Sequence, residues 1–174
     1  MKIPFFALLI GTVLTASVIG FRLYKDTEVK KDRKNTFAIQ NVKTGTCVRP
    51  KDANYKENTS IILYPHHNWE CMTWRLIDVG NHTFLLENLY TEKTFQPVTE
   101  LADGTELSQI SLDGSALQFW EIIEQPDHAY LIRLQNTDYY LTAPSDVENT
   151  PVVLKTVMND DSQRWRLIPQ TPVF

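Results

Sequence analysis

The chain has 174 residues, of which 43% are hydrophobic and 22% are charged, which is typical of one globular domain with a terminal appendage. Six glycines and two cysteines exclude collagen-like and disulfide-dense proteins. The net charge of −4 is unevenly divided, because residues 1–34 carry +4 and residues 35–174 carry −8. Such an acidic body repels phosphate backbones, so we expect no nucleic-acid binding.

The N-terminal part of the chain predicts a targeting or anchoring segment. Residues 5–21 form an uncharged run of seventeen residues, and either a cleaved signal peptide or a membrane anchor over residues 1–24 fits it. Residues 25–34 then form a charged linker. The basic residues after the run favour a cytoplasmic body, whereas a start in Met-Lys before an apolar run is typical of export. We expect a secreted or membrane-anchored protein, with its folded body outside the cytoplasm.

From residue 35 onward, short β-favouring runs alternate with turn signals, and no long helical period occurs. Three tryptophans recur at spacings of 46 and 45 residues, in the segments MTWRLI, QFWEII and QRWRLI. Each segment predicts a strand whose tryptophan faces the core. The core tryptophans are therefore expected to be Trp74, Trp120 and Trp165.

Each unit of about 46 residues carries four short strands, and three units fill residues 35–170. One unit cannot bury its apolar face alone, but three units around a pseudo-threefold axis can close a small barrel. We therefore predict an all-β protein with a β-trefoil over residues 35–174 and the N-terminal hydrophobic segment outside it. A three-bladed propeller is the geometric alternative.

An asparagine recurs before a turn in each unit, within the segments Phe37–Asn41, Phe84–Asn88 and Leu131–Asn136. Asparagine side chains commonly bond to the backbone two residues further on. We therefore expect turn formation, rather than ligand binding, from Asn41, Asn88 and Asn136.

The repeats resemble the ricin-B-type lectin family, whose mark is a threefold Gln-x-Trp strand. Gln118-Phe119-Trp120 and Gln163-Arg164-Trp165 match this mark, whereas Met72-Thr73-Trp74 departs from it at the glutamine. Gly45–Arg49 is similar to the family's turn before Cys-Leu-Asp. The resemblance implies a non-catalytic binding module. There is also a looser similarity of plan to the accessory A and C subunits of cytolethal distending toxins.

Members of this family bind galactose-type sugars on an aromatic ring, with an aspartate after the Cys-Leu pair binding the hydroxyls. In repeat one the resemblance assigns these two roles to Tyr64 and Arg49, with Asp52 nearby. The corresponding pairs in the other repeats are Ile110 with Gln96, and Lys155 with Thr142. No repeat has the full set, so the resemblance implies binding by repeat one alone, with altered chemistry.

The segment that follows Tyr64, PHHNWEC, is the most unusual in the chain. As a ligand loop it would supply the ring of Trp69 and polar contacts from His66, His67 and Asn68. A solvated surface loop is the plain alternative. A metal site of His66, His67, Glu70 and Cys71 follows no recognised zinc spacing, so no metal or cofactor is expected.

Two classes of partner are consistent with these residues. The first is a glycan held weakly by repeat one, and Arg49 in place of an aspartate favours acidic sugars over neutral galactose. The second is a protein that docks on the acidic trefoil of a toxin-like complex, with the sugar sites lost. Gly-x-Ser-x-Gly, His-Glu-x-x-His and Gly-rich phosphate loops are absent from the sequence, so we expect no enzyme.

Both cysteines, Cys47 and Cys71, lie in repeat one. In an exported chain such a pair predicts a disulfide, which would stabilise the fold by about 2–4 kcal/mol. In a cytoplasmic body, both would be free thiols.

Overall fold

The computed structural model describes residues 35–172, which contain twelve strands, four short 3-10 turns and no α-helix. Residues 1–24 and 25–34, with the predicted signal or anchor and linker, lie outside the described residues. Within the described part, no helix is long and apolar enough to cross a membrane.

Six strands form a closed antiparallel barrel, in which the last strand pairs with the first. Because the ring is closed, these strands leave no exposed sheet edge. Around the ring they follow the order β1 (Thr36–Asn41), β4 (Trp74–Gly80), β5 (Thr83–Asn88), β8 (Trp120–Glu124), β9 (Tyr130–Leu134) and β12 (Arg164–Pro169).

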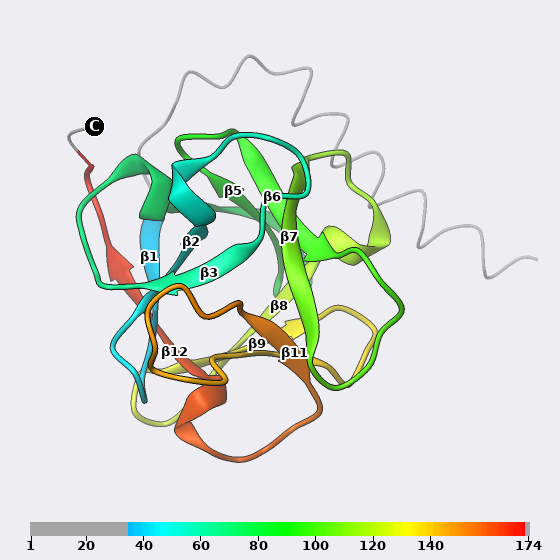
Figure 1. The fold of residues 1–174 in the computed structure, drawn as a ribbon. Helices are drawn as coiled ribbons and strands as arrows, with labels where there is room; N and C mark the ends of the chain where they lie inside the picture. The colour runs from blue at the N-terminus through cyan, green and yellow to red at the C-terminus, as the bar shows by residue number, and fades with distance from the viewer. Residues whose placement is uncertain (1–34, 173–174) are drawn as a thin grey trace, which may run out of the picture. The chain divides into compact units, whose positions relative to one another are not determined.

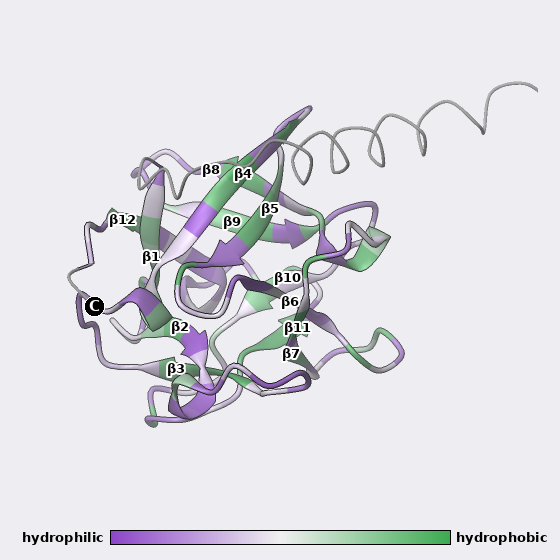
Figure 2. Ribbon diagram, turned by 90° about the horizontal axis from the view of Figure 1, so that it is seen from above, coloured by the Kyte–Doolittle hydropathy of each residue, from purple (hydrophilic) through white to green (hydrophobic). Residues whose placement is uncertain are grey.

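Three hairpins, one from each repeat, lie at one end of the barrel (Figures 1 and 2). They bond to one another through Ser60 with Ser108, Ile62 with Pro151, and strand β11 with β7. The predicted all-β trefoil is therefore confirmed. The hairpins are β2 (Cys47–Pro50) with β3 (Ile61–Tyr64), β6 (Lys93–Pro97) with β7 (Thr105–Ser111), and β10 (Tyr140–Thr142) with β11 (Val153–Lys155).

One of the four 3-10 turns lies within a hairpin, and the other three precede the tryptophan strands. The turn η1 (Lys51–Ala53) follows strand β2 of repeat one. Each of the others comes directly before the tryptophan strand of its repeat, and these are η2 (Glu70–Met72), η3 (Ala116–Gln118) and η4 (Asp161–Gln163).

The three repeat tryptophans form the centre of the core, as predicted, and all are 0% exposed. The indole nitrogens of Trp74 and Trp165 donate to backbone carbonyls of β2 and β10 at 2.9 and 3.0 Å. Trp120 differs, because its buried indole nitrogen has no hydrogen-bond partner among the described residues. Phe95 lies next to it, with ring centroids 5.1 Å apart.

The recurring asparagines are equivalent in two repeats but not in the third. Asn41 and Asn88 both accept bonds from backbone amides two and three residues later, as expected of turn residues. In the third repeat the residue opposite the tryptophan is Leu134, not Asn136. Asn136 is therefore not equivalent to Asn41 and Asn88, and that prediction is wrong. Strand β9 pairs two residues away from the register that the sequence match implied.

Candidate functional site

The resemblance assigned one residue of each repeat to the family's aromatic position. Strand pairing confirms that these three residues occupy equivalent places in the three hairpins. Tyr64 pairs with Cys47 in the hairpin of repeat one. The equivalent pairs are Ile110 with Thr94 and Lys155 with Tyr140. Two residues further along the first strand of each hairpin are Arg49, Gln96 and Thr142, at the family's aspartate position.

In repeats two and three, the residue at this aspartate position is already bound within its own repeat. Gln118 donates through Nε2 to Gln96 Oε1 at 3.0 Å. Gln163 donates through Nε2 to Thr142 Oγ1, also at 3.0 Å. The glutamine of each Gln-x-Trp strand therefore joins the hairpin to the turn before the tryptophan, and uses polar groups that a sugar would need.

Repeat one has no such connection, because Met72 stands at the glutamine position. Its side chain is fully buried in an apolar cluster with Ala38, Cys47 and Cys71. A thioether cannot donate hydrogen bonds. Met72 therefore leaves the polar end of Arg49 without the partner that the other two repeats provide.

Arg49 is 6% exposed, and its guanidinium lies among aromatic rings rather than beside a carboxylate. Its Cζ atom is 4.7 Å from the ring centroid of Tyr64 and 5.9 Å from that of Trp69. Its Nε donates to the carbonyl of Pro50 at 3.1 Å. Within residues 35–172, its two terminal nitrogens have neither a hydrogen-bond nor an ion-pair partner. Cation–π contacts offset part of the cost of burying this charge.

The rings beside Arg49 form one group on the loop that follows β3. His67 and Trp69 are stacked, with centroids 4.1 Å apart and planes 11° apart. Tyr64 is tilted against both, at 6.1 Å from His67 and 6.4 Å from Trp69. One face of the Tyr64 ring is in contact with Arg49, so only the other face can pack against a sugar.

The other predicted site residues lie around this group. Asn68 donates to the carbonyl of Thr171 at 3.1 Å, and His66 lies 3.0 Å from the amide nitrogen of Gln170. Asp52 is exposed on the turn η1, whose Ala53 packs in the same cluster as Tyr64 and Trp69. Gln170 was not predicted from the sequence, since it lies outside every repeat motif. Among the described residues, no group of three His, Cys, Asp or Glu could hold a metal ion.

In this structure Cys47 and Cys71 are free and buried thiols in one cluster, and the disulfide stays a prediction. Burial raises the pKa of Cys47 to about 12. Burial also raises the pKa of Cys71, and the charge of Arg49 opposes part of that increase.

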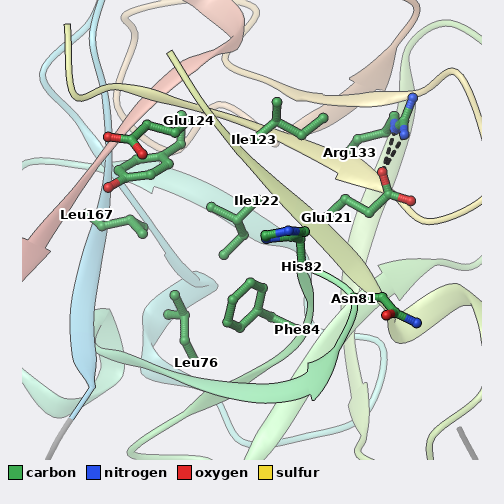
Figure 3. Close-up of a pocket in the computed structure, with 11 residues that line it drawn as sticks. Leu76, Asn81, His82, Phe84, Glu121, Ile122, Ile123, Glu124, Arg133 and Leu167 are labelled. Carbon is green, nitrogen blue, oxygen red and sulfur yellow. Dashed lines mark hydrogen bonds and ion pairs between the residues drawn. The ribbon is translucent and has the colours of Figure 1, made fainter. Parts of the chain in front are cut away.

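A concave surface, with a volume of about 710 Å³, is lined by residues of the barrel strands and the loops between them (Figure 3). Its apolar lining includes Leu76, Phe84, Ile122 and Leu167. At its side, Glu121 and Arg133 form an ion pair. None of the predicted site residues lines this cavity, so it is separate from the ring group of repeat one.

A known protein family matches the sequence of this trefoil. The family described as ricin-type β-trefoil lectin domain-like matches residues 21–110, which is just over half of the chain. The chain belongs to this family. In this ricin-type trefoil, the repeat that carries Arg49 and Tyr64 lies within the matched residues, whereas repeat three does not. A search of curated proteins found no match.

Solved structures agree on the fold of this ricin-type trefoil. The designed threefold-symmetric protein ThreeFoil is 20% identical with a TM-score of 0.74, over 77% of this chain and 98% of its own. A ricin B-like lectin from Macrolepiota procera, solved with lactose, is 25% identical with a TM-score of 0.67, over 76% and 94%. The Rhizoctonia solani agglutinin is 20% identical with a TM-score of 0.71, over 78% and 95%.

Proposed function

We propose that the chain is a non-catalytic carbohydrate-binding module that recognises acidic sugars, weakly, through repeat one. Membership of the ricin-type trefoil lectin family supports the class of function. The lactose complex of the Macrolepiota procera lectin supports sugar as the class of ligand for a related fold.

One observation carries the choice of an acidic sugar. The guanidinium of Arg49 is nearly buried, yet no carboxylate of residues 35–172 pairs with it. A cation held among aromatic rings without a counter-charge favours an anionic ligand over a neutral one. The planar fork of arginine also suits a carboxylate, which it can bind through two parallel hydrogen bonds.

The neighbouring rings would supply the remaining contacts. The free face of Tyr64 and the stacked pair of His67 and Trp69 suit the apolar C–H face of a sugar ring. The site is shallow and single, because repeats two and three have their polar groups engaged. Such a site leaves little free energy after the entropic cost of binding, so strong attachment requires several copies.

A glycan array with the full chain tests this proposal. We expect binding to glycans that carry a carboxylate, such as sialylated ones, and not to their neutral counterparts. Arg49→Met should weaken binding at least about tenfold, which corresponds to about 1.4 kcal/mol. Arg49→Lys should recover only part of it, because an ammonium keeps the charge but not the fork.

Arg166→Met is the matched control. Arg166 is exposed on β12, so this substitution removes the same charge from a place outside the proposed site. It should bind as the native chain does. A blank array at high protein density would reject the glycan. Recovery of a basic polypeptide by the same protein would instead favour the alternative, a targeting subunit whose acidic body binds a protein.

We also propose that the module acts outside the cytoplasm, either released or anchored through residues 5–21. The seventeen uncharged residues of this run support a targeting or anchoring role. N-terminal sequencing of the mature protein distinguishes the two forms. A body protected from protease in sealed cells would contradict both.

A further inference from the structure

The loop of residues 65–69 carries two rings of the repeat-one site, but no glutamine of its own repeat holds it. In repeats two and three, Gln118 and Gln163 accept hydrogen bonds from backbone amides of the segments before them. Met72 has this position in repeat one and cannot replace those bonds. The loop therefore needs partners from elsewhere in the fold.

Gln170, the residue after β12, supplies those partners from the other end of the chain. It is 7% exposed, and its Nε2 donates to the carbonyl of His67 at 3.0 Å. Its Oε1 accepts from the hydroxyl of Thr73 at 2.7 Å. Its backbone is joined to the first barrel strand by two bonds with Thr36, of 2.9 and 2.7 Å. Gln170 thus connects the ring-bearing loop to the rigid barrel.

The same amide nitrogen also lies 3.0 Å from Nε2 of His66. The carbonyl of His67 can only accept, so the atom of Gln170 that faces it must be the NH₂ group. This nitrogen can therefore only donate to His66, whose Nε2 must be an unprotonated acceptor. Protonation of His66 would set two donors against each other and break the contact.

We propose that Gln170 is a positioning residue of the repeat-one site, and that protonation of His66 breaks one of the contacts that hold the loop. This inference rests on the proposed function. Imidazole side chains change charge between pH 5 and 8, so the site holds its rings in place at neutral pH and loosens in mild acid. The protein would then bind an acidic glycan more tightly with His66 neutral than with His66 protonated.

Other ionisable groups near His66 do not replace this mechanism. Residues 170–172 of the C-terminal segment carry no titratable side chain, so the contact from that side is uncharged. Sugar carboxylates have pKa values near those of other carboxylic acids and stay ionised above about pH 5. The ionisable residues on the loop and on the elements packed beside it are Cys47, Arg49, Lys51, Asp52, Tyr64, His67, Glu70, Cys71, Arg164 and Arg166.

The first test observes the loop without any glycan. The indole N–H signal of Trp69 in a nitrogen-labelled NMR spectrum is identified by its loss in Trp69→Phe. In the native full chain, we expect this signal to shift between pH 7.5 and 5.5. The shift should vanish in His66→Gln. It should persist in His67→Gln, which removes the imidazole that stacks on Trp69, and in His82→Gln, a remote control.

The second test measures binding of a sialylated glycan by Gln170 variants. Native affinity should fall at least about fivefold from pH 7.5 to 5.5. Gln170→Ala should bind more weakly than the native protein at pH 7.5 and lose the pH dependence. Gln170→Glu presents an acceptor to His66, so its affinity should rise on acidification, opposite to the native trend.

These outcomes separate the inference from the proposed function. If no glycan binds at any pH while the Trp69 signal behaves as expected, the proposed function fails and the role of Gln170 stands. A Trp69 signal with the same pH dependence in His66→Gln as in the native chain would overturn the inference. Native pH dependence of binding in Gln170→Glu would do the same.

Discussion

Single residues at equivalent places in the three repeats have acquired different roles in this molecule. The aspartate position of the family is Arg49 in repeat one, Gln96 in repeat two and Thr142 in repeat three. Only Arg49 keeps a polar end without a partner among the described residues. The asymmetry therefore gives repeat one a nearly buried arginine, whereas Gln96 and Thr142 bond to the glutamines of their own repeats.

The core tryptophans also differ between repeats, because only some of their indole nitrogens have a hydrogen-bond partner. Trp165→Phe leaves the carbonyl of Leu141 without its donor, whereas Trp120→Phe removes a buried N–H that had no partner. An unpaired buried polar group is unfavourable, so we expect Trp165→Phe to destabilise by about 1 kcal/mol more than Trp120→Phe. Denaturant unfolding of both variants checks this. An equal or reversed order would contradict it, and Trp74→Phe should resemble Trp165→Phe.

At the scale of elements, the turn before each tryptophan strand is held by a side chain, and the source of that side chain differs. Turns η3 and η4 contain their own glutamines, Gln118 and Gln163. Turn η2 contains Met72 instead, so Asn88 donates to the carbonyl of Cys71 within it, and Gln170 bonds to His67 and Thr73 on either side of it. An element that is closed by a distant residue can move without disrupting its own repeat, which suits a ligand-binding loop.

Gln118→Met gives repeat two the residue that repeat one has at this position, Met72. It removes the acceptor of the amides of Asp113 and Gly114, at 3.0 and 2.9 Å, and the donor to the carbonyl of Ser111. We expect a loss of about 2 kcal/mol in unfolding free energy. In hydrogen exchange, the two amides should exchange faster than in the native chain.

Gln125→Met is the control for that change, because Gln125 bonds only to nearby carbonyls at the end of a hairpin. It should change stability by less than about 0.5 kcal/mol. Equal effects of the two substitutions would show that the glutamine in η3 is not a structural link.

For the whole molecule, closure of the barrel makes every repeat dependent on the others. Cys47 lies within repeat one, where its strand pairs with β1 on one side and with β3 on the other. It is 0% exposed, so a reagent reaches its sulfur only when its hairpin or the whole fold opens. Thiol reactivity therefore tests whether this hairpin opens separately from the rest of the fold.

We expect both thiols to be unreactive toward an aromatic disulfide reagent at pH 8 in the native state. The free energy from labelling rates across denaturant should equal that from equilibrium unfolding. A fast reaction of either thiol without denaturant would contradict the buried arrangement. Burial raises the pKa of Cys47 to about 12, above that of an exposed thiol. Its contribution to stability is thus complete below about pH 8.5 and declines as pH rises toward 12.

The sequence alone determined the trefoil, the core tryptophans and the equivalence of Tyr64, Ile110 and Lys155. These features follow from local periodicity, which the chain repeats three times. Tertiary structure alone decided that Arg49 has aromatic neighbours instead of a counter-charge, and that the two cysteines share one buried cluster as thiols. It also decided the role of Gln170, which meets the loop of His66 from 104 residues away. Such contacts depend on how the barrel closes, and no short-range pattern encodes that closure.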